Sequence, residues 1–285
     1  MYALECEKMK GRGESVKIRS AIVVGATGLV GTELVKLLCE SDKYISITVI
    51  SRRKLDYKHP KLTVKIRAFD ELGEQDFDFA DDLFCCLGTT MKKAGSRMEF
   101  EKVDFEYPLQ IASLAKKQGV RHFIVISAMS ANEKSSIYYS RVKGKLENEL
   151  KELDLPQLSI VRPSLLVGKR NEFRFGEKMG ETILKILNPV FIGPLKKFRS
   201  IEAKQVALAM MVIALHSKKI PIAIYDSSEL ATLTMPSKDK EEEAISREQL
   251  FNWDKLKKED PLPVDEEVVF DKSKLREVKV DDDLK

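Results

Sequence analysis

A glycine-rich segment, Val24-Gly25-Ala26-Thr27-Gly28-Leu29-Val30-Gly31, constrains the fold of this 285-residue chain more than any other feature. It follows a short apolar run and precedes a helical pattern, which predicts a tight turn between a strand and a helix. Gly25 permits the turn, Gly28 lets a ligand approach the backbone, and Gly31 lets the helix pack against the strand. The helix amides then face a phosphate group, which a helix N-terminus favours. We expect pyrophosphate contacts from Gly25, Thr27, Gly28, Leu29, Val30 and Gly31.

Beyond this turn, short apolar runs alternate with helical patterns, as in a parallel sheet with crossover helices. Strands are predicted at residues 21–25, 47–51, 62–69, 82–87, 122–127, 158–162 and 222–225. Helices are predicted at residues 31–40, 104–118, 136–153, 176–188 and 202–216. Right-handed crossovers wind such a chain into a doubly wound α/β sheet of the Rossmann type, with helices on both faces.

The predicted dinucleotide-binding domain spans residues 16–230. It includes a small substrate lid at about residues 163–205, too short for a full second domain. Residues 231–285 are rich in charge, with 16 acidic and 11 basic side chains, which leaves a net charge of +9 on residues 1–230. We expect a loosely attached or disordered tail. The alternative is partial docking through Phe251 and Trp253.

Composition narrows the class of protein further. Hydrophobic residues make up 43% of the chain, and the longest apolar run, residues 206–215, is too short to span a bilayer. The N-terminus has no secretory signal, so a cytoplasmic, non-membrane protein is expected. Residues 1–230 have a net positive charge but lack the interleaved aromatic and basic residues of a nucleic-acid-binding surface, so no nucleic-acid partner is expected. The four cysteines form no C-x-x-C pair and the three histidines are isolated, so we expect reduced thiols and no metal.

Two arginines, Arg52 and Arg53, follow the second strand, where NAD-binding sites usually carry an acidic residue. Guanidinium groups suit a ribose 2′-phosphate, which a carboxylate would repel. NADP(H) is therefore expected in preference to NAD(H). Asp70 closes the third predicted strand and is expected beside the adenine. The alternative for the arginines is a solvated pair at a strand end.

A catalytic pair is predicted at Tyr139 and Lys143, which lie four residues apart on one face of a helix. The lysine and an oxidised nicotinamide would lower the pKa of the phenol and let it act as a general acid or base. Ser127 ends the fifth strand, and its hydroxyl could hold a substrate carbonyl. The alternative is an exposed tyrosine and lysine on a solvated face.

Together these features resemble the extended and atypical branch of the short-chain dehydrogenase/reductase superfamily. A more specific resemblance is to the Tat-interacting-protein-like oxidoreductases and their bacterial relatives. It runs from about residue 20 to about residue 214. The shared stretches are Gly25-Ala26-Thr27-Gly28, Ser51-Arg52-Arg53-Lys54-Leu55, Phe84-Cys85-Cys86-Leu87-Gly88-Thr89-Thr90, Lys93-Ala94-Gly95, Tyr139-x-x-Val142-Lys143-Gly144 and Arg162-Pro163.

This resemblance implies further contacts. Leu87 and Gly88 would pass beside the nicotinamide ribose, which Lys143 would also hydrogen-bond. Leu166 and Arg174 would close over the cofactor, with Arg174 a candidate phosphate contact and Arg170 its competitor. Animal members of the group are better described as regulators that bind proteins, so retaining the pair does not establish turnover.

The leading hypothesis is an NADP(H)-dependent oxidoreductase of a small carbonyl or alcohol, with Tyr139, Lys143 and Ser127 in catalysis. The alternative is a catalytically weak NADPH-binding regulator that acts through protein partners. A nucleotide-sugar epimerase is a weaker hypothesis, because it needs a larger second domain and tends to keep NAD bound. A homodimer and a separate protein partner both stay open.

Overall fold

The computed structural model describes residues 18–168, 199–216 and 220–235, and these contain a seven-stranded sheet with the order β3-β2-β1-β4-β5-β6-β9. All neighbouring strands in this sheet are parallel. The order reverses between β1 and β4, which is where open α/β sheets bind ligands. The strands are β1 (Arg19–Val24), β2 (Tyr44–Ser51), β3 (Leu62–Ile66), β4 (Asp82–Cys85), β5 (His122–Ile126), β6 (Leu158–Arg162) and β9 (Ile222–Asp226).

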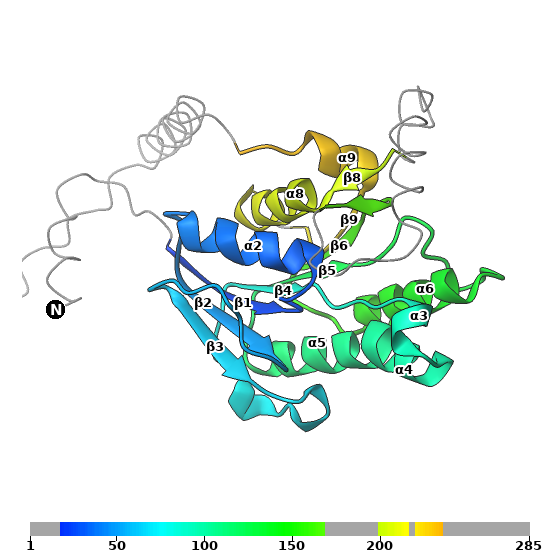
Figure 1. Ribbon diagram of the computed structural model, residues 1–285, viewed down its shortest axis with the longest axis horizontal. Coiled ribbons are helices and arrows are strands. Elements are labelled where there is room, and N and C mark those ends of the chain that lie inside the picture. Colours follow the sequence, from blue (N-terminus) through cyan, green and yellow to red (C-terminus); the bar gives the residue numbers. More distant parts are fainter. Residues whose placement is uncertain (1–17, 169–198, 217–219, 236–285) are drawn as a thin grey trace, which may run out of the picture. The chain divides into compact units, whose positions relative to one another are not determined.

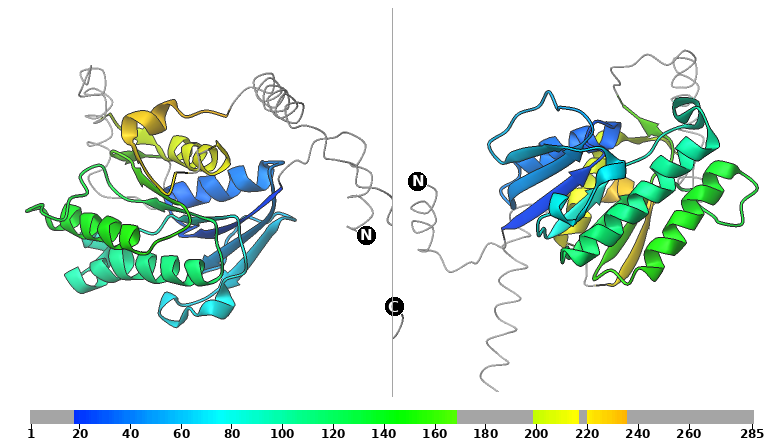
Figure 2. Two further views of the ribbon diagram at one scale, coloured as in Figure 1. Left: turned by 180° about the vertical axis from the view of Figure 1, so that it is seen from behind. Right: turned by 90° about the horizontal axis from the view of Figure 1, so that it is seen from below.

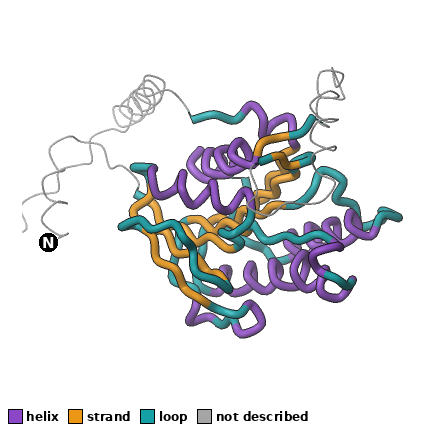
Figure 3. Tube along the Cα trace, viewed as in Figure 1, coloured by secondary structure: helices purple, strands orange, loops and turns teal. Residues whose placement is uncertain are grey.

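Helices cover both faces of the sheet (Figures 1 and 3). Helices α2 (Leu29–Glu40) and α8 (Ala203–His216) pack side by side on one face. The other face carries α5 (Tyr107–Lys117), which continues a π-helical segment, Lys102–Glu106, and α6 (Tyr138–Glu152) (Figure 2). Three short helices complete this part of the chain: α3 (Met91–Ala94), α4 (Arg97–Glu101) and α9 (Ser227–Thr232).

Alternating strand residues build two buried cores, one on each face of the sheet. In β1, Val23 packs with the α2 and α8 side chains, whereas Ile22 and Val24 pack with those of α5 and α6. Side chains alternate between faces along a strand, so a strand buried on both faces reads as a continuous apolar run. The fold class predicted from sequence is therefore confirmed.

Some element bounds differ from those predicted. The third strand ends at Ile66 and not at residue 69, because Phe69–Glu71 forms a 3₁₀ turn. The fourth strand ends at Cys85 and not at residue 87. The short helices α3 and α4 are absent from the prediction, since runs of four and five residues leave little periodicity to detect.

Parts of the predicted organisation lie outside the described residues. They are the helix at 176–188, nearly all of the predicted tail, and Cys6. The chain divides into two units between Met235 and Pro236, and the second of these units is also outside the described residues. Of the predicted lid, the structure describes β7 (Leu166–Val167) and β8 (Ile201–Glu202), which pair in parallel.

Cys39, Cys85 and Cys86 are free, and burial raises the pKa of Cys39 and of Cys85 to about 11. Within the described ranges, no helix combines the length and the apolar character needed to cross a bilayer.

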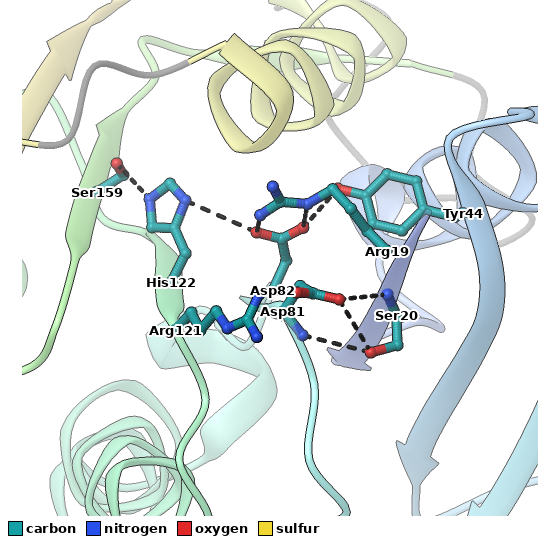
Figure 4. Close-up of polar contacts among 8 residues, drawn as sticks. All are labelled: Arg19, Ser20, Tyr44, Asp81, Asp82, Arg121, His122 and Ser159. Carbon is teal, nitrogen blue, oxygen red and sulfur yellow. Dashed lines mark hydrogen bonds and ion pairs between the residues drawn. The ribbon is translucent and has the colours of Figure 1, made fainter. Parts of the chain in front are cut away.

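A buried polar network crosses the amino ends of the strands (Figure 4). Arg19 donates from Nε and Nη2 to the two carboxylate oxygens of Asp82, at 2.7 and 2.5 Å. The hydroxyl of Tyr44 donates to Asp82 Oδ2 at 2.7 Å. The ring of His122 bonds Ser159 Oγ through Nε2 at 2.8 Å. Each of these residues lies in a different strand or at its start, so the network ties the sheet together at this edge.

Candidate functional site

The glycine turn packs directly on the end of the neighbouring strand β4. Gly25 has a φ of +85°, a conformation that side chains rarely adopt. A Cβ at Gly25 would lie 2.6 Å from the carbonyl carbon of Cys86, and one at Gly31 would lie 2.3 Å from the carbonyl oxygen of Gly25. The backbone N–H of Gly28 donates to that same oxygen at 3.0 Å. Only glycine therefore fits at Gly25 and Gly31.

The start of α2 is suited to an anion. Gly28 is the N-cap, no side chain caps the helix, and its first turn contains no acidic residue. Thr27 and Gly28 are exposed, whereas Leu29 is partly buried and Val30 is buried against the core. An uncapped helix N-terminus presents free amides and a positive dipole end. These features fit the pyrophosphate of a dinucleotide.

The two arginines lie exposed after β2. The Arg52 guanidinium is 5.5 Å from the centre of the Phe69 ring, and the N–H of Arg53 donates to Ser51 Oγ at 3.2 Å. Strands β1 and β2 are neighbours in the parallel sheet, so their carboxyl ends meet at the same edge. The arginines and the glycine turn therefore lie along one edge of the sheet.

Asp70 lies in the 3₁₀ turn after β3 and is exposed. Its Oδ1 is 2.7 Å from Lys102 Nζ, and its Oδ2 accepts a hydrogen bond from the Tyr107 hydroxyl at 3.0 Å. These two hydrogen bonds hold the pKa of Asp70 below its usual value. The carboxylate thus joins this turn to the start of α5, and a contact with adenine stays a prediction.

The predicted catalytic pair lies on α6. Lys143 is only 2% exposed, and Tyr139 is partly buried with its ring centre 5.8 Å from that of Phe100. Burial raises the pKa of Tyr139, Lys143 lowers it, and Asp104 raises it, with a net increase. The expected lowering by Lys143 is therefore present, but burial outweighs it in the unliganded protein.

Asp104 was not predicted as a site residue. It lies in the π-helical segment, is 1% exposed, and places Oδ1 2.8 Å from Lys143 Nζ. Its Oδ2 accepts the backbone N–H of Thr89 at 2.7 Å. A Cβ at Gly88 would lie 3.6 Å from Asp104 Oδ1. Asp104 thus connects the loop after β4 with Lys143 of the predicted catalytic pair.

Ser127 does not join this group. Its hydroxyl donates to Glu147 Oε1 at 2.5 Å, and Arg162 donates from Nε to the same oxygen at 2.9 Å. Both Ser127 and Glu147 are buried, at 4% and 1% exposed. The only hydroxyl proton of Ser127 is therefore used within the protein, and a bond to a substrate carbonyl would require this hydroxyl to turn.

The remaining predicted cofactor contacts fall into two groups. Leu87 is buried and Gly88 exposed in the loop after β4. Leu166 is partly buried in β7, and a Cβ at nearby Gly168 would lie 3.5 Å from the Leu29 side chain at the start of α2. Strand β7 therefore passes beside the glycine turn. Arg170 and Arg174 lie outside the described residues.

A line of contacts joins the two halves of the site. Gly25 packs on Cys86, which is followed by Leu87 and Gly88, and Gly88 adjoins the carboxylate that pairs with Lys143. The glycine turn and the tyrosine–lysine helix, 114 residues apart in sequence between Gly25 and Tyr139, are thereby linked through the loop after β4.

Sequence reasoning missed Asp104 and Glu147. Glu147 continues the four-residue spacing of Tyr139 and Lys143, and that spacing could have placed it on the same buried face. Asp104 carried no comparable signal, because an aspartate at the predicted start of a helix is an ordinary capping residue.

The sheet order, the glycine turn and the tyrosine–lysine helix define a protein with the short-chain dehydrogenase/reductase fold. Two solved structures share it, UDP-N-acetylglucosamine 4-epimerase from Methanobrevibacter ruminantium M1 in complex with UDP-N-acetylmuramic acid and MoeE5 in complex with UDP-glucose and NAD. Their TM-scores are 0.57 and 0.55, and their sequence identities are 16% and 13%. Each alignment covers 74% of this chain, with 77% and 79% of the other chain. At these identities the likeness concerns the fold alone.

Sequence relatives give the family. HTATIP2 from Rattus norvegicus is 37% identical over 164 residues, covering 56% of this chain and 67% of that protein. FMP52 from Debaryomyces hansenii is 35% identical over 156 residues, covering 54% and 69%. The family model described as HIM1 matches residues 55–191. The chain belongs to the family of HTATIP2- and FMP52-type proteins, which confirms the predicted resemblance.

The expected cytoplasmic location is wrong. The FMP52 relatives from Debaryomyces hansenii, Scheffersomyces stipitis and Meyerozyma guilliermondii are all named as mitochondrial proteins. Composition and the N-terminal sequence carried the expectation, and neither reports the compartment of a family.

Proposed function

We propose that the protein is an NADP(H)-dependent oxidoreductase acting on a small carbonyl or alcohol. The line of contacts from Gly25 through the loop after β4 to Lys143 supports this proposal, because it joins the glycine turn to the helix that carries Tyr139 and Lys143. Residues 16–230 form the cofactor-binding domain. The pyrophosphate lies on the glycine turn, the adenine near Asp70, and the nicotinamide ribose beside Leu87 and Gly88.

The bound nicotinamide supplies the redox chemistry, and the chain supplies orientation and proton transfer. Tyr139 exchanges a proton with the substrate oxygen. Lys143 holds the ribose and favours the ionised phenol. Ser127 contacts the substrate oxygen after releasing Glu147. Leu166 covers the cofactor, and Arg174 or Arg170 contacts a phosphate.

The arginines set the cofactor preference. Hydrogen bonds to charged groups contribute about 1.5–3 kcal/mol each, so losing two should cost about 100-fold or more in affinity. Replacing Arg52 and Arg53 together by alanine should raise the Kd for NADPH by that factor and leave the Kd for NADH nearly unchanged. Fluorescence titration with each nucleotide measures this. Lys58→Ala removes an exposed cation from the same connection and serves as the control.

Failure to bind either reduced nucleotide would refute the whole proposal. Equal loss of affinity for both nucleotides in the arginine variant would instead refute the assignment of the 2′-phosphate site. The proposal that the chain binds a nicotinamide dinucleotide would still stand.

Catalysis is tested at Tyr139. A positioned general acid contributes about 10²–10⁴ in rate, so Tyr139→Phe should lower turnover on a carbonyl panel by that order while NADPH affinity stays the same. Tyr138→Phe is the matched control, because this neighbouring hydroxyl donates to the carbonyl oxygen of Arg97 at 3.1 Å. A loss of less than about threefold in Tyr139→Phe would end the catalytic assignment.

A second candidate is a catalytically weak NADPH-binding regulator that acts through protein partners. Two observations favour it: burial raises the pKa of Tyr139, and Ser127 bonds Glu147. It predicts NADPH binding without turnover of any carbonyl. Gel filtration with and without NADPH tests whether the nucleotide changes the assembly of the protein. The reductase assay, run beside it, tests for turnover.

A further inference from the structure

Asp104 is held at both of its carboxylate oxygens. Oδ1 lies 2.8 Å from the ammonium of Lys143, and Oδ2 accepts the Thr89 N–H at 2.7 Å. The carboxylate is 1% exposed and the lysine 2% exposed, so water screens neither charge effectively. The two opposite charges of this buried pair therefore act in opposite directions on a neighbouring titratable group.

Tyr139 is that neighbouring group. Lys143 faces it from the same helix, Asp104 from the π-helical segment, and the apolar ring of Phe100 from α4. The lysine alone favours the ionised phenol, while the carboxylate and the apolar surroundings oppose it. At Tyr139 the charge of Lys143 is therefore opposed by that of Asp104.

We propose that Asp104 is a positioning residue, which fixes the Lys143 ammonium and cancels most of the positive charge that Lys143 presents to Tyr139. Its catalytic meaning rests on the proposed function, but the charge balance belongs to the protein without cofactor or substrate. Asp104 and Lys143 thus act on Tyr139 in opposite directions, and the tyrosine keeps its proton in the resting protein.

The direct test is Asp104→Asn. The amide keeps the shape of the side chain and an oxygen for the Thr89 N–H, but it removes the negative charge. The unopposed ammonium should lower the pKa of Tyr139 by about one unit or more. The readout is the pH titration of tyrosinate absorbance, taken as the difference between each protein and its Tyr139→Phe counterpart. An unchanged or higher pKa overturns the proposal.

A double variant tests the same balance without leaving an unpaired charge in the interior. Asp104→Asn with Lys143→Met removes both buried charges, so no unpaired charge remains in the interior. If the pair is balanced in the wild-type protein, the pKa of Tyr139 should match the wild-type value. A clearly higher pKa in the double variant would mean that the lysine charge was felt uncancelled, and it would overturn the proposal.

Asp76 provides a matched control. Its side chain is 2% exposed, pairs with Arg67 Nε at 2.5 Å, and accepts the Gly73 N–H at 3.1 Å, so it resembles Asp104 in chemistry. Asp76→Asn should leave the pKa of Tyr139 unchanged, and a change as large as that in Asp104→Asn would refute a specific role. These titrations need no nucleotide, so a failure of NADPH binding or turnover would leave their outcome untouched.

Discussion

Two separate energetic costs disfavour any other residue at the position of Gly25. One is conformational, because its φ of +85° lies in the region that disfavours side chains. The other is steric, because a Cβ would lie 2.6 Å from both the carbonyl carbon and the carbonyl oxygen of Cys86. Backbone at this distance cannot swing aside as a flexible side chain could. The turn and the end of β4 would have to separate, and the proposed nucleotide site lies at this junction.

Gly25→Ala should therefore be less stable than the conformational penalty alone predicts, which is about 1–2 kcal/mol. Gly119→Ala is the control, since Gly119 has a φ of +72° but nothing within 4 Å of an added Cβ. Urea unfolding of both variants measures the difference, and Gly25→Ala should also lose NADPH binding. Equal stability of the two variants would show that the close packing on Cys86 has no energetic effect.

Site residues could be predicted where the signal was local. Tyr139 and Lys143 share a helix face at a spacing of four, and the glycine turn lies between a strand and a helix. Asp104 meets Lys143 across 39 positions of sequence, so its role depends on how α6 packs beside the π-helical segment. Ser127 was predicted to end the fifth strand and directly follows β5, which ends at Ile126, but the acceptor of its hydroxyl proton is set by a tertiary contact.

At the scale of elements, α6 presents one buried polar face. Tyr139, Lys143 and Glu147 follow one another at intervals of four residues. Glu147 accepts from both Ser127 after β5 and Arg162 at the end of β6. Helix α6 is thus tied to two strands of the sheet through a single buried carboxylate, which keeps the face with the proposed catalytic pair directed at the loop after β4.

Removing Arg162 should loosen this tie. Arg162→Met leaves the buried Glu147 without its cation, and breaking a buried pair costs about 3–5 kcal/mol, here at the lower end because the arginine side chain is 27% exposed. Urea unfolding measures the loss, and Glu147→Gln added to Arg162→Met should recover part of it. Lys36→Ala, in an exposed pair with Glu33, should change stability by less than about 1 kcal/mol. An equal effect in the two single variants would contradict the tie.

Element boundaries were less predictable than element types. The predicted third strand runs to residue 69, because Phe69 is apolar and continues the pattern of core residues. The observed strand ends at Ile66, although Phe69 is buried. In the structure Phe69 is buried from a 3₁₀ turn, where its ring meets Tyr107 at 5.3 Å. An apolar residue can enter a core from a turn as well as from a strand, so burial alone does not extend a strand.

At the scale of the whole described unit, the carboxyl and amino ends of the parallel strands carry different groups of polar residues. The carboxyl ends of the strands carry the glycine turn, the arginines and the loop after β4. The amino ends carry the buried network of Arg19, Asp82 and His122 (Figure 4). Ligands bind at the carboxyl edge of such sheets, so polar groups at the opposite edge are free to serve stability.

His122 makes this stability depend on pH. Burial, followed by the charge of Arg19, lowers the pKa of His122 to about 3 in the folded protein, while Nδ1 lies 3.7 Å from Asp82 Oδ1. An unfolded histidine titrates near pH 6.5. Between these values the unfolded chain binds a proton that the folded chain refuses, so stability falls as the pH falls, by up to about 1.4 kcal/mol per pH unit. The stability that the folded protein gains from a neutral His122 is fully present above the unfolded pKa, and it is lost progressively as the pH falls below that value.

His122→Gln keeps a polar group that can bond Ser159 but has no proton to take up. Its free energy of unfolding should therefore fall less steeply between about pH 6 and pH 4 than that of the wild-type protein, by the equivalent of about one proton. Urea unfolding at several pH values measures both slopes. His216→Gln, at an exposed histidine, should keep the wild-type slope. Parallel slopes for His122→Gln and the wild type would mean that His122 takes up its proton equally in both states and has no part in acid sensitivity.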